Sequence, residues 1–262
     1  MFDLIDIGTN LTHDSFNPDR DEIIKRASEA GVKRLIVTGT SLEASQQAVE
    51  LTQLYPNQLF STAGVHPHHA ASINADTLVS LRKLAQAESV VAVGECGLDF
   101  FRDYSPRDAQ LAGFEAQLRI ATEVKKPVFL HQREAHDAMI NLLRQYRPEI
   151  AAGVAHCFTG NASELKDYLD IGLYIGITGW ICDERRGNEL REAVKFLPLD
   201  RILLETDAPY LLPRDLAEKP SGRRNEPSTL PHILDRVAHY MNRPVAEVAA
   251  AATRNTEELF KI

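Results

Sequence analysis

Short apolar runs alternate with amphipathic segments along almost the whole chain. The run V-V-A-V at residues 90–93 is typical, because its β-branched and small residues predict a strand buried on both faces, as in a parallel sheet. Eight such runs are predicted as strands, at residues 2–8, 33–39, 59–66, 90–94, 127–131, 153–158, 173–177 and 201–205.

The segments between these runs repeat their apolar residues with the period of an α-helix. The predicted helices occupy residues 19–30, 42–54, 76–86, 107–124, 135–146, 162–170, 230–240 and 245–252, with a further helix after residue 186. The first of them has clear boundaries, since Asp19 and Glu22 have the spacing of a capping box and Gly31 follows the last turn.

The spacing of the predicted strands indicates the fold. Their ends recur about every 28 residues, close to the roughly 30 residues that a strand–helix–strand unit needs. The chain has 262 residues, and a (β/α)8 barrel typically needs about 250. We therefore expect an α/β fold made of a single (β/α)8 TIM-type barrel over residues 1–262. The alternative is an open doubly wound sheet, but no G-x-G-x-x-G turn follows the first predicted strand.

Composition and charge limit where in the cell the chain is expected and what it is expected to bind. It is 44% hydrophobic, yet no apolar run approaches the roughly 20 residues of a membrane-spanning helix. The N-terminus lacks the basic region of a secretory signal, so we expect a cytoplasmic protein. The net charge of −8 argues against a broadly basic surface for duplex DNA. Because a barrel buries its own core, we also expect a monomer.

Polar residues stand at the carboxyl ends of six predicted strands. They are Asn10, His66, Glu95, His131, His156 and Asp207. In a (β/α)8 barrel these ends meet at one rim, where active sites lie. A lone histidine is more often a packed residue than a ligand, and Glu95 alone could form a structural salt bridge. Three imidazoles and two carboxylates on one rim are instead typical of a divalent-metal hydrolase.

The motifs that contain these residues resemble a known family. They are G-V-H-P-H (64–68), G-E-C-G-L-D (94–99), H-Q-R-E-A (131–135), H-C-F-T-G (156–160), T-D-A-P-Y (206–210) and S-G-R-R-N-E-P (221–227). Together they resemble the TatD family of metal-dependent deoxyribonucleases, which belongs to the amidohydrolase-like barrels, and they cover essentially the whole chain. The resemblance implies a 3′→5′ exonuclease that hydrolyses single-stranded DNA and RNA, with a role in DNA repair or nucleic-acid turnover.

The same resemblance implies a role for each rim residue. Glu95 would bridge or face the metal, His131 and His156 would be imidazole ligands, and Asp207 would bind metal and take a proton from the attacking water. His66 would lie beside the scissile phosphate.

One stretch departs from the wider family, in which many members begin D-x-H-x-H. Here the aligned residues are Asp6-Ile7-Gly8-Thr9-Asn10, so both histidines are replaced. The site formed by Glu95, His131 and His156 stays rich in nitrogen and suits Zn²⁺ or Mn²⁺. The other site would combine Asp207, Glu95 and the amide oxygen of Asn10, an oxygen-dominated set that suits Mg²⁺. We expect one or two divalent ions, with Mg²⁺ serving activity.

Basic residues near the rim are candidates for binding substrate phosphate, because guanidinium groups pair bidentately with it. They are Arg133, Arg186, Arg223 and Arg224, together with His68. The alternative for such arginines is a solvated face or a salt bridge. Trp180 and Phe100 or Phe101 could stack on unpaired bases, although packing is the commoner role of such rings.

Three cysteines, Cys96, Cys157 and Cys182, lie beside the motif residues but form no C-x-x-C pair, so we expect small packing residues and no disulfide framework.

Two other functions stay open at this point. One is an amidohydrolase-like enzyme acting on an amide or ester, including a tRNA-linked substrate, since one barrel serves many hydrolyses. The other is a non-catalytic nucleic-acid-binding scaffold.

Overall fold

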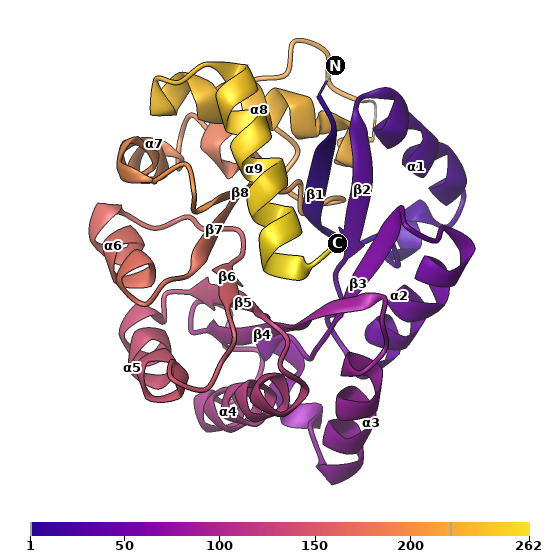
Figure 1. Cartoon of the computed structure of the whole chain (residues 1–262), viewed down its shortest axis with the longest axis vertical. Helices are drawn as coiled ribbons and strands as arrows, with labels where there is room; N and C mark the ends of the chain where they lie inside the picture. Colours follow the sequence, from indigo (N-terminus) through magenta and orange to yellow (C-terminus); the bar gives the residue numbers. More distant parts are fainter. Residues whose placement is uncertain (1, 221) are drawn as a thin grey trace.

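A computed structural model describes residues 2–220 and 222–262 of the chain, and it contains one eight-stranded parallel sheet in which each strand pairs with the next along the chain. The strands are β1 (Leu4–Thr9), β2 (Val32–Val37), β3 (Leu59–Ala63), β4 (Val90–Asp99), β5 (Val128–Arg133), β6 (Gly153–Ala155), β7 (Tyr174–Ile177) and β8 (Ile202–Leu204). Every pair from β1–β2 to β7–β8 is parallel. The predicted (β/α)8 barrel is confirmed (Figure 1).

The sheet closes between its first and last strands just beyond the end of β8. Thr9 and Ala208 form a parallel bridge, and the backbone N–H of Asp207 donates to the carbonyl of Gly8 at 2.8 Å. The buried carboxylate of Asp6 adds to this seam, since it accepts hydrogen bonds from the backbone N–H and the hydroxyl of Thr206 at 2.9 and 2.5 Å. Closure brings residues about 200 positions apart to the same rim.

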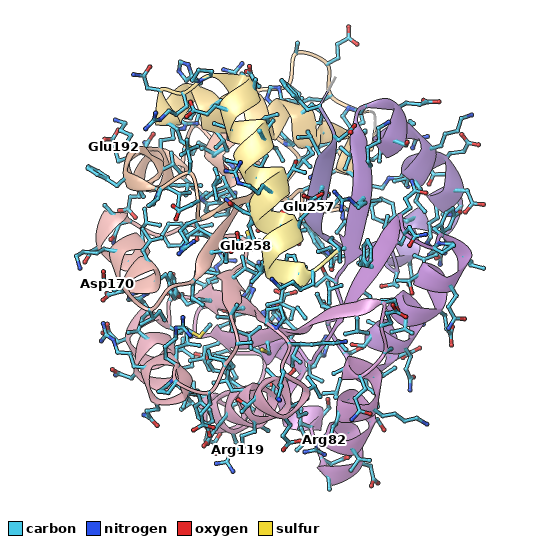
Figure 2. The ribbon with its side chains drawn as sticks, viewed as in Figure 1. Arg82, Arg119, Asp170, Glu192, Glu257 and Glu258 are labelled. Carbon is cyan, nitrogen blue, oxygen red and sulfur yellow. The ribbon has the colours of Figure 1, made fainter. Side chains whose placement is uncertain are left out.

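The helices surround the strands (Figure 1). They are α1 (Arg20–Glu29), α2 (Leu42–Leu54), α3 (Ala75–Ala85), α4 (Arg107–Val124), α5 (His136–Tyr146), α6 (Ala162–Asp170), α7 (Asn188–Ala193), α8 (Leu230–Met241) and α9 (Val245–Phe260). The charged side chains of Arg82, Arg119, Asp170 and Glu192 point outward from this ring (Figure 2). No helix within residues 2–220 and 222–262 is long and apolar enough to cross a membrane.

Helix α1 begins where the sequence predicts, but its capping differs from the prediction. Asp19 is the N-cap residue, yet its side chain makes no capping hydrogen bond. The carboxylate instead accepts from the guanidinium of Arg224 at 2.7 and 2.8 Å. An ion pair with a distant loop therefore replaces the local capping box.

Helix α9 closes the end of the barrel that lies opposite the catalytic rim. Its residues Leu259 and Phe260 pack into a buried cluster with side chains from inside the barrel, including Ile36 and Phe129. In Figure 1 this yellow helix crosses the end of the barrel that is in view. The predicted helix at residues 245–252 was too short, because this packing continues the helix to Phe260. This end of the barrel is therefore filled by apolar side chains.

Two strand ends also differ from the predictions. Strand β4 does not stop at Gly94 but continues to Asp99, with a shift in its register against β5 between Gly94 and Cys96. Strand β3 ends at Ala63, so His66 follows it by three residues and caps a short 3₁₀ helix, Pro67–Ser72. Glu95 therefore lies within its strand, whereas His66 lies beyond the end of its own.

Candidate active site

The structure gathers the predicted ligands at the open rim of the barrel, around one oxygen atom, Glu95 Oε1. His131 Nδ1 lies 2.9 Å from this oxygen. His156 Nε2 lies 3.3 Å from it and His66 Nε2 lies 3.4 Å from it. Three imidazoles from β5 and from the ends of β6 and β3 therefore converge on one carboxylate of β4.

The charges of this cluster are strongly coupled. Burial would raise the pKa of Glu95, but the surrounding imidazoles hold it well below its ordinary value. Burial lowers the pKa of His66 to about 4, against the opposing attraction of Glu95. The carboxylate is therefore ionised and His66 is neutral at pH 7, which are the protonation states that a metal ligand needs.

His131 is held between two acids. Its Nδ1 contacts Glu95, while its Nε2 lies 3.6 Å from Asp99 Oδ2, beyond hydrogen-bond distance, and is buried without a hydrogen-bond partner. Asp99 is itself fixed, since its other oxygen accepts from the backbone N–H of Phe101 and Arg102 at 3.0 and 2.8 Å. His131 Nδ1 is therefore the ring atom that faces the Glu95 cluster, whereas its buried Nε2 faces Asp99.

His156 is oriented from behind by Glu205, which is fully buried. Glu205 Oε2 lies 2.6 Å from His156 Nδ1, and its Oε1 accepts from the backbone N–H of Cys157 at 2.5 Å. Although burial opposes a charge on His156, the two carboxylates Glu205 and Glu95 raise its pKa well above the ordinary value. Such a carboxylate fixes the tautomer and orientation of a ligating histidine.

The carboxylate of Glu205 lies in a slot between two glycines, Gly8 and Gly176. A Cβ added to Gly8 would lie 2.5 Å from Glu205 Oε2, and one added to Gly176 would lie 2.4 Å from Oε1. A side chain at position 8 would therefore require the end of the Glu205 side chain to move.

Asp207 and Asn10 form the second part of the site. The amide nitrogen of Asn10 donates to Asp207 Oδ1 at 3.1 Å and to the carbonyl of Ala208 at 3.3 Å. This orientation leaves the amide oxygen of Asn10 available as a ligand. Burial raises the pKa of Asp207 to about 7, and the neighbouring carboxylates Glu95 and Glu205 add to the rise.

The residues present fit a divalent ion. His66, Glu95 and His131 each offer a ligand atom, and these atoms lie within 4.8 Å of one another. His66 belongs to this group, and its predicted place beside the scissile phosphate stays a prediction.

A second group with ligand spacing is Cys182, Asp215 and His232. Its charges are already balanced, because Asp215 contacts His232 at 2.6 Å and Arg236 at 3.4 Å.

Two of the predicted phosphate-binding residues lie at the rim and are stacked on aromatic rings. The guanidinium of Arg133 lies 4.0 Å from the ring centre of Phe101. That of Arg186 lies 4.2 Å from the ring centre of Trp180 and pairs with Asp183 at 2.9 Å. Both side chains are therefore oriented, and Arg186 already has a carboxylate partner.

The contacts of the other predicted phosphate ligands differ from one residue to the next. Arg224 donates to Asp19 and Glu226, and it ties the loop after β8 to the start of α1. Its charge is already balanced by two carboxylates, as that of Arg186 is by Asp183, and its predicted role as a phosphate ligand stays a prediction. Arg223 is exposed, and His68 Nε2 contacts Asp99 Oδ2 at 2.7 Å.

The three cysteines are free thiols, as expected, and burial raises the pKa of each. They are therefore protonated packing residues rather than ligands.

Comparison with known proteins agrees with this geometry. A family model described as TatD related DNase matches residues 5–261. The chain belongs to the TatD family. The 3′-5′ ssDNA/RNA exonuclease TatD of Erwinia tasmaniensis is 52% identical over 259 residues, which cover 99% of this chain and 100% of that protein. The exonuclease TatD of Erwinia amylovora is 53% identical over 257 residues, covering 98% and 99%.

Solved structures agree with the TatD assignment. A TatD homologue from Escherichia coli K12 superposes with a TM-score of 0.91 at 30% identity, covering 99% of this chain and 98% of that one. The E. coli phosphotriesterase homology protein has a TM-score of 0.71 at 13% identity and covers 99% of both chains, which supports the barrel fold alone.

Sequence reasoning missed two carboxylates that support the TatD-type site. Glu205 ends an apolar strand and Asp99 ends the motif G-E-C-G-L-D, so both carried the signal used for Glu95. Both are buried, and each contacts a histidine through its carboxylate. An ionisable group at the end of a buried strand was therefore the signal that could have identified them.

Proposed function

We propose that this chain is a metal-dependent 3′→5′ exonuclease that hydrolyses phosphodiester bonds in single-stranded DNA and RNA. One observation carries the proposal: three imidazoles surround Glu95 Oε1 in a chain whose relatives at 52–53% identity are named 3′-5′ ssDNA/RNA exonucleases. A barrel alone would not specify a substrate, because one fold serves many reactions.

The donor types divide into two sets in this proposal. His66, His131 and His156 together with Glu95 form a nitrogen-rich set that suits Zn²⁺ or Mn²⁺. Asp207 and Asn10, sharing Glu95, form an oxygen-rich set that suits the Mg²⁺ we propose for activity. A divalent ion held by either set supplies Lewis-acid chemistry to the phosphoryl group and to water.

The chain's own side chains position and deprotonate the reactants. Asp207 takes the proton of the attacking water as the general base. Arg133, Arg186, Arg223 and His68 hold the substrate phosphates at the rim, where guanidinium groups pair bidentately with phosphate oxygens. We further propose a cytoplasmic monomer that acts in DNA repair or nucleic-acid turnover.

Digestion of an end-labelled single-stranded oligonucleotide tests this function. The purified protein is incubated with EDTA, Mg²⁺, Mn²⁺ or Zn²⁺ beside the Glu95→Ala variant. A metal-dependent ladder that shortens from the 3′ end and disappears in the variant is the expected result. If no ion supports cleavage, the proposal is wrong and assays for amide and ester hydrolysis follow. Binding without cleavage in both proteins would instead favour a scaffold.

A further inference from the structure

Exposed aromatic side chains are concentrated at the catalytic rim. Within residues 2–220 and 222–262 the exposed phenylalanines and tyrosines are Phe2, Phe101, Tyr104, Phe196 and Tyr210. Three of these, Phe101, Tyr104 and Tyr210, belong to the loops that follow β4 and β8, beside Glu95 and Asp207. Large exposed rings beside a substrate site are typical of binding surfaces.

Tyr104 is connected to the ligand cluster by a series of ring contacts. Its ring centre lies 4.7 Å from that of His68, which lies 4.2 Å from that of His66. His66 in turn contacts Glu95 Oε1 at 3.4 Å. Tyr104 is 66% exposed, so its ring stands in solvent only one side chain away from a proposed metal ligand.

Tyr210 stands beside the other half of the site. Its backbone N–H donates to the carbonyl of Asp207 at 2.9 Å, and the residue is 51% exposed. Burial raises the pKa of the Tyr210 hydroxyl, and the charges of Asp207 and Glu95 add to the rise, which fits a ring beside both carboxylates.

The loops that carry the two tyrosines follow strands on opposite sides of the barrel. Tyr104 follows β4 and Tyr210 follows β8, and these strands are four positions apart in a closed sheet of eight. The two loops therefore flank the mouth of the barrel.

The other rim rings are occupied by protein cations. Phe101 is covered by the guanidinium of Arg133 at 4.0 Å, and Trp180 by that of Arg186 at 4.2 Å. Tyr104 and Tyr210 contact only histidine rings, in edge-to-face geometry, among the aromatic and cation–π contacts of the described residues. They are therefore the rings best placed to receive a base.

We propose that Tyr104 and Tyr210 form a two-sided clamp that stacks on unpaired bases at the 3′ end of the substrate. This inference rests on the proposed function and extends it to the selection of single strands. Every base has a π-face, so such a clamp tolerates any sequence. In a duplex the bases are already stacked and paired, and freeing one costs a few kcal/mol. The clamp therefore favours single strands and frayed ends.

Binding measured without cleavage tests the clamp directly. Fluorescence anisotropy in EDTA gives the Kd for a labelled single-stranded oligonucleotide, and the variants are Tyr104→Ala, Tyr210→Ala and their phenylalanine counterparts. Stacking predicts that each alanine weakens binding about 5- to 150-fold, while phenylalanine keeps the affinity within about twofold. The matched control is Phe196→Ala, an aromatic residue that is 70% exposed and lies between α7 and β8.

A second substrate separates stacking from other effects of these substitutions. An oligonucleotide whose last nucleotides are abasic offers no ring, so wild type and both alanine variants should bind it equally weakly. With metal added, the alanine variants should raise KM for the ordinary oligonucleotide more than they lower kcat.

Two outcomes would overturn the inference in different ways. If the wild type degrades single strands and both alanine variants bind like Phe196→Ala, the clamp is wrong and the proposed function stands. If the wild type neither binds nor cleaves any single strand, the proposed function fails and the clamp fails with it.

Discussion

Replacing Glu205 with glutamine tests how the chain positions a metal ligand from behind. The substitution preserves volume in the slot between Gly8 and Gly176 but turns one carboxylate oxygen into an amide donor. The backbone N–H of Cys157 can only donate, so the new amide oxygen must face it. The amide NH₂ then faces His156 Nδ1 and forces that nitrogen to accept.

The consequence falls on the opposite nitrogen of the same ring. A neutral His156 that accepts at Nδ1 carries its proton on Nε2, the atom that lies 3.3 Å from Glu95 Oε1. That nitrogen then has no free lone pair for an ion. The substitution removes the buried, charge-assisted hydrogen bond between His156 Nδ1 and Glu205. Such bonds contribute about 1.5–3 kcal/mol. At about 1.4 kcal/mol per tenfold change, the expected loss of metal affinity is about 10- to 100-fold.

Isothermal titration with Mn²⁺ or Zn²⁺ measures this loss, and ¹⁵N chemical shifts of the His156 ring report the tautomer. Glu258→Gln, on the outer surface of α9, is the matched control and should bind like wild type (Figure 2). Unchanged affinity in Glu205→Gln, with the wild-type ring spectrum, would refute the proposed role of Glu205.

Two further predictions concern stability. Phe260→Ala should lower the free energy of unfolding by about 3–5 kcal/mol in a denaturant titration, because it empties the packed end of the barrel, and unchanged stability would contradict this packing. The Phe260→Ala variant should bind metal with wild-type affinity, since α9 lies opposite the catalytic rim. Asp19→Asn should cost about 0.5–1 kcal/mol at pH 7. The hydrogen bond and charge of Arg224 lower the pKa of Asp19, so this contribution is present above about pH 4 and is lost as the pH falls through the lower folded-state pKa. A difference between Asp19→Asn and wild type that stays constant down to pH 2 would contradict the ion pair.

The sequence by itself determined the barrel and the chemistry of its rim. Strand and helix periods are local properties, so eight apolar runs at even spacing were enough to predict the architecture. The rim followed from the rule that parallel strands share one carboxyl end, which brought Glu95, His131, His156 and Asp207 together without knowledge of their contacts. Element ends were less predictable, because β4 and α9 extend through packing that hydrophobic periodicity does not encode.

Only the tertiary structure decided which charges are already paired and which side chains remain available. Arg224 and Asp19 are 205 positions apart in the sequence, and barrel closure makes them partners. The same closure places the carboxylate of Glu205 against Gly8. It also places β4 and β8, the strands that precede Tyr104 and Tyr210, on opposite sides of the barrel. Residue type determines what a side chain can do, but its partners depend on contacts between segments that are remote in the chain.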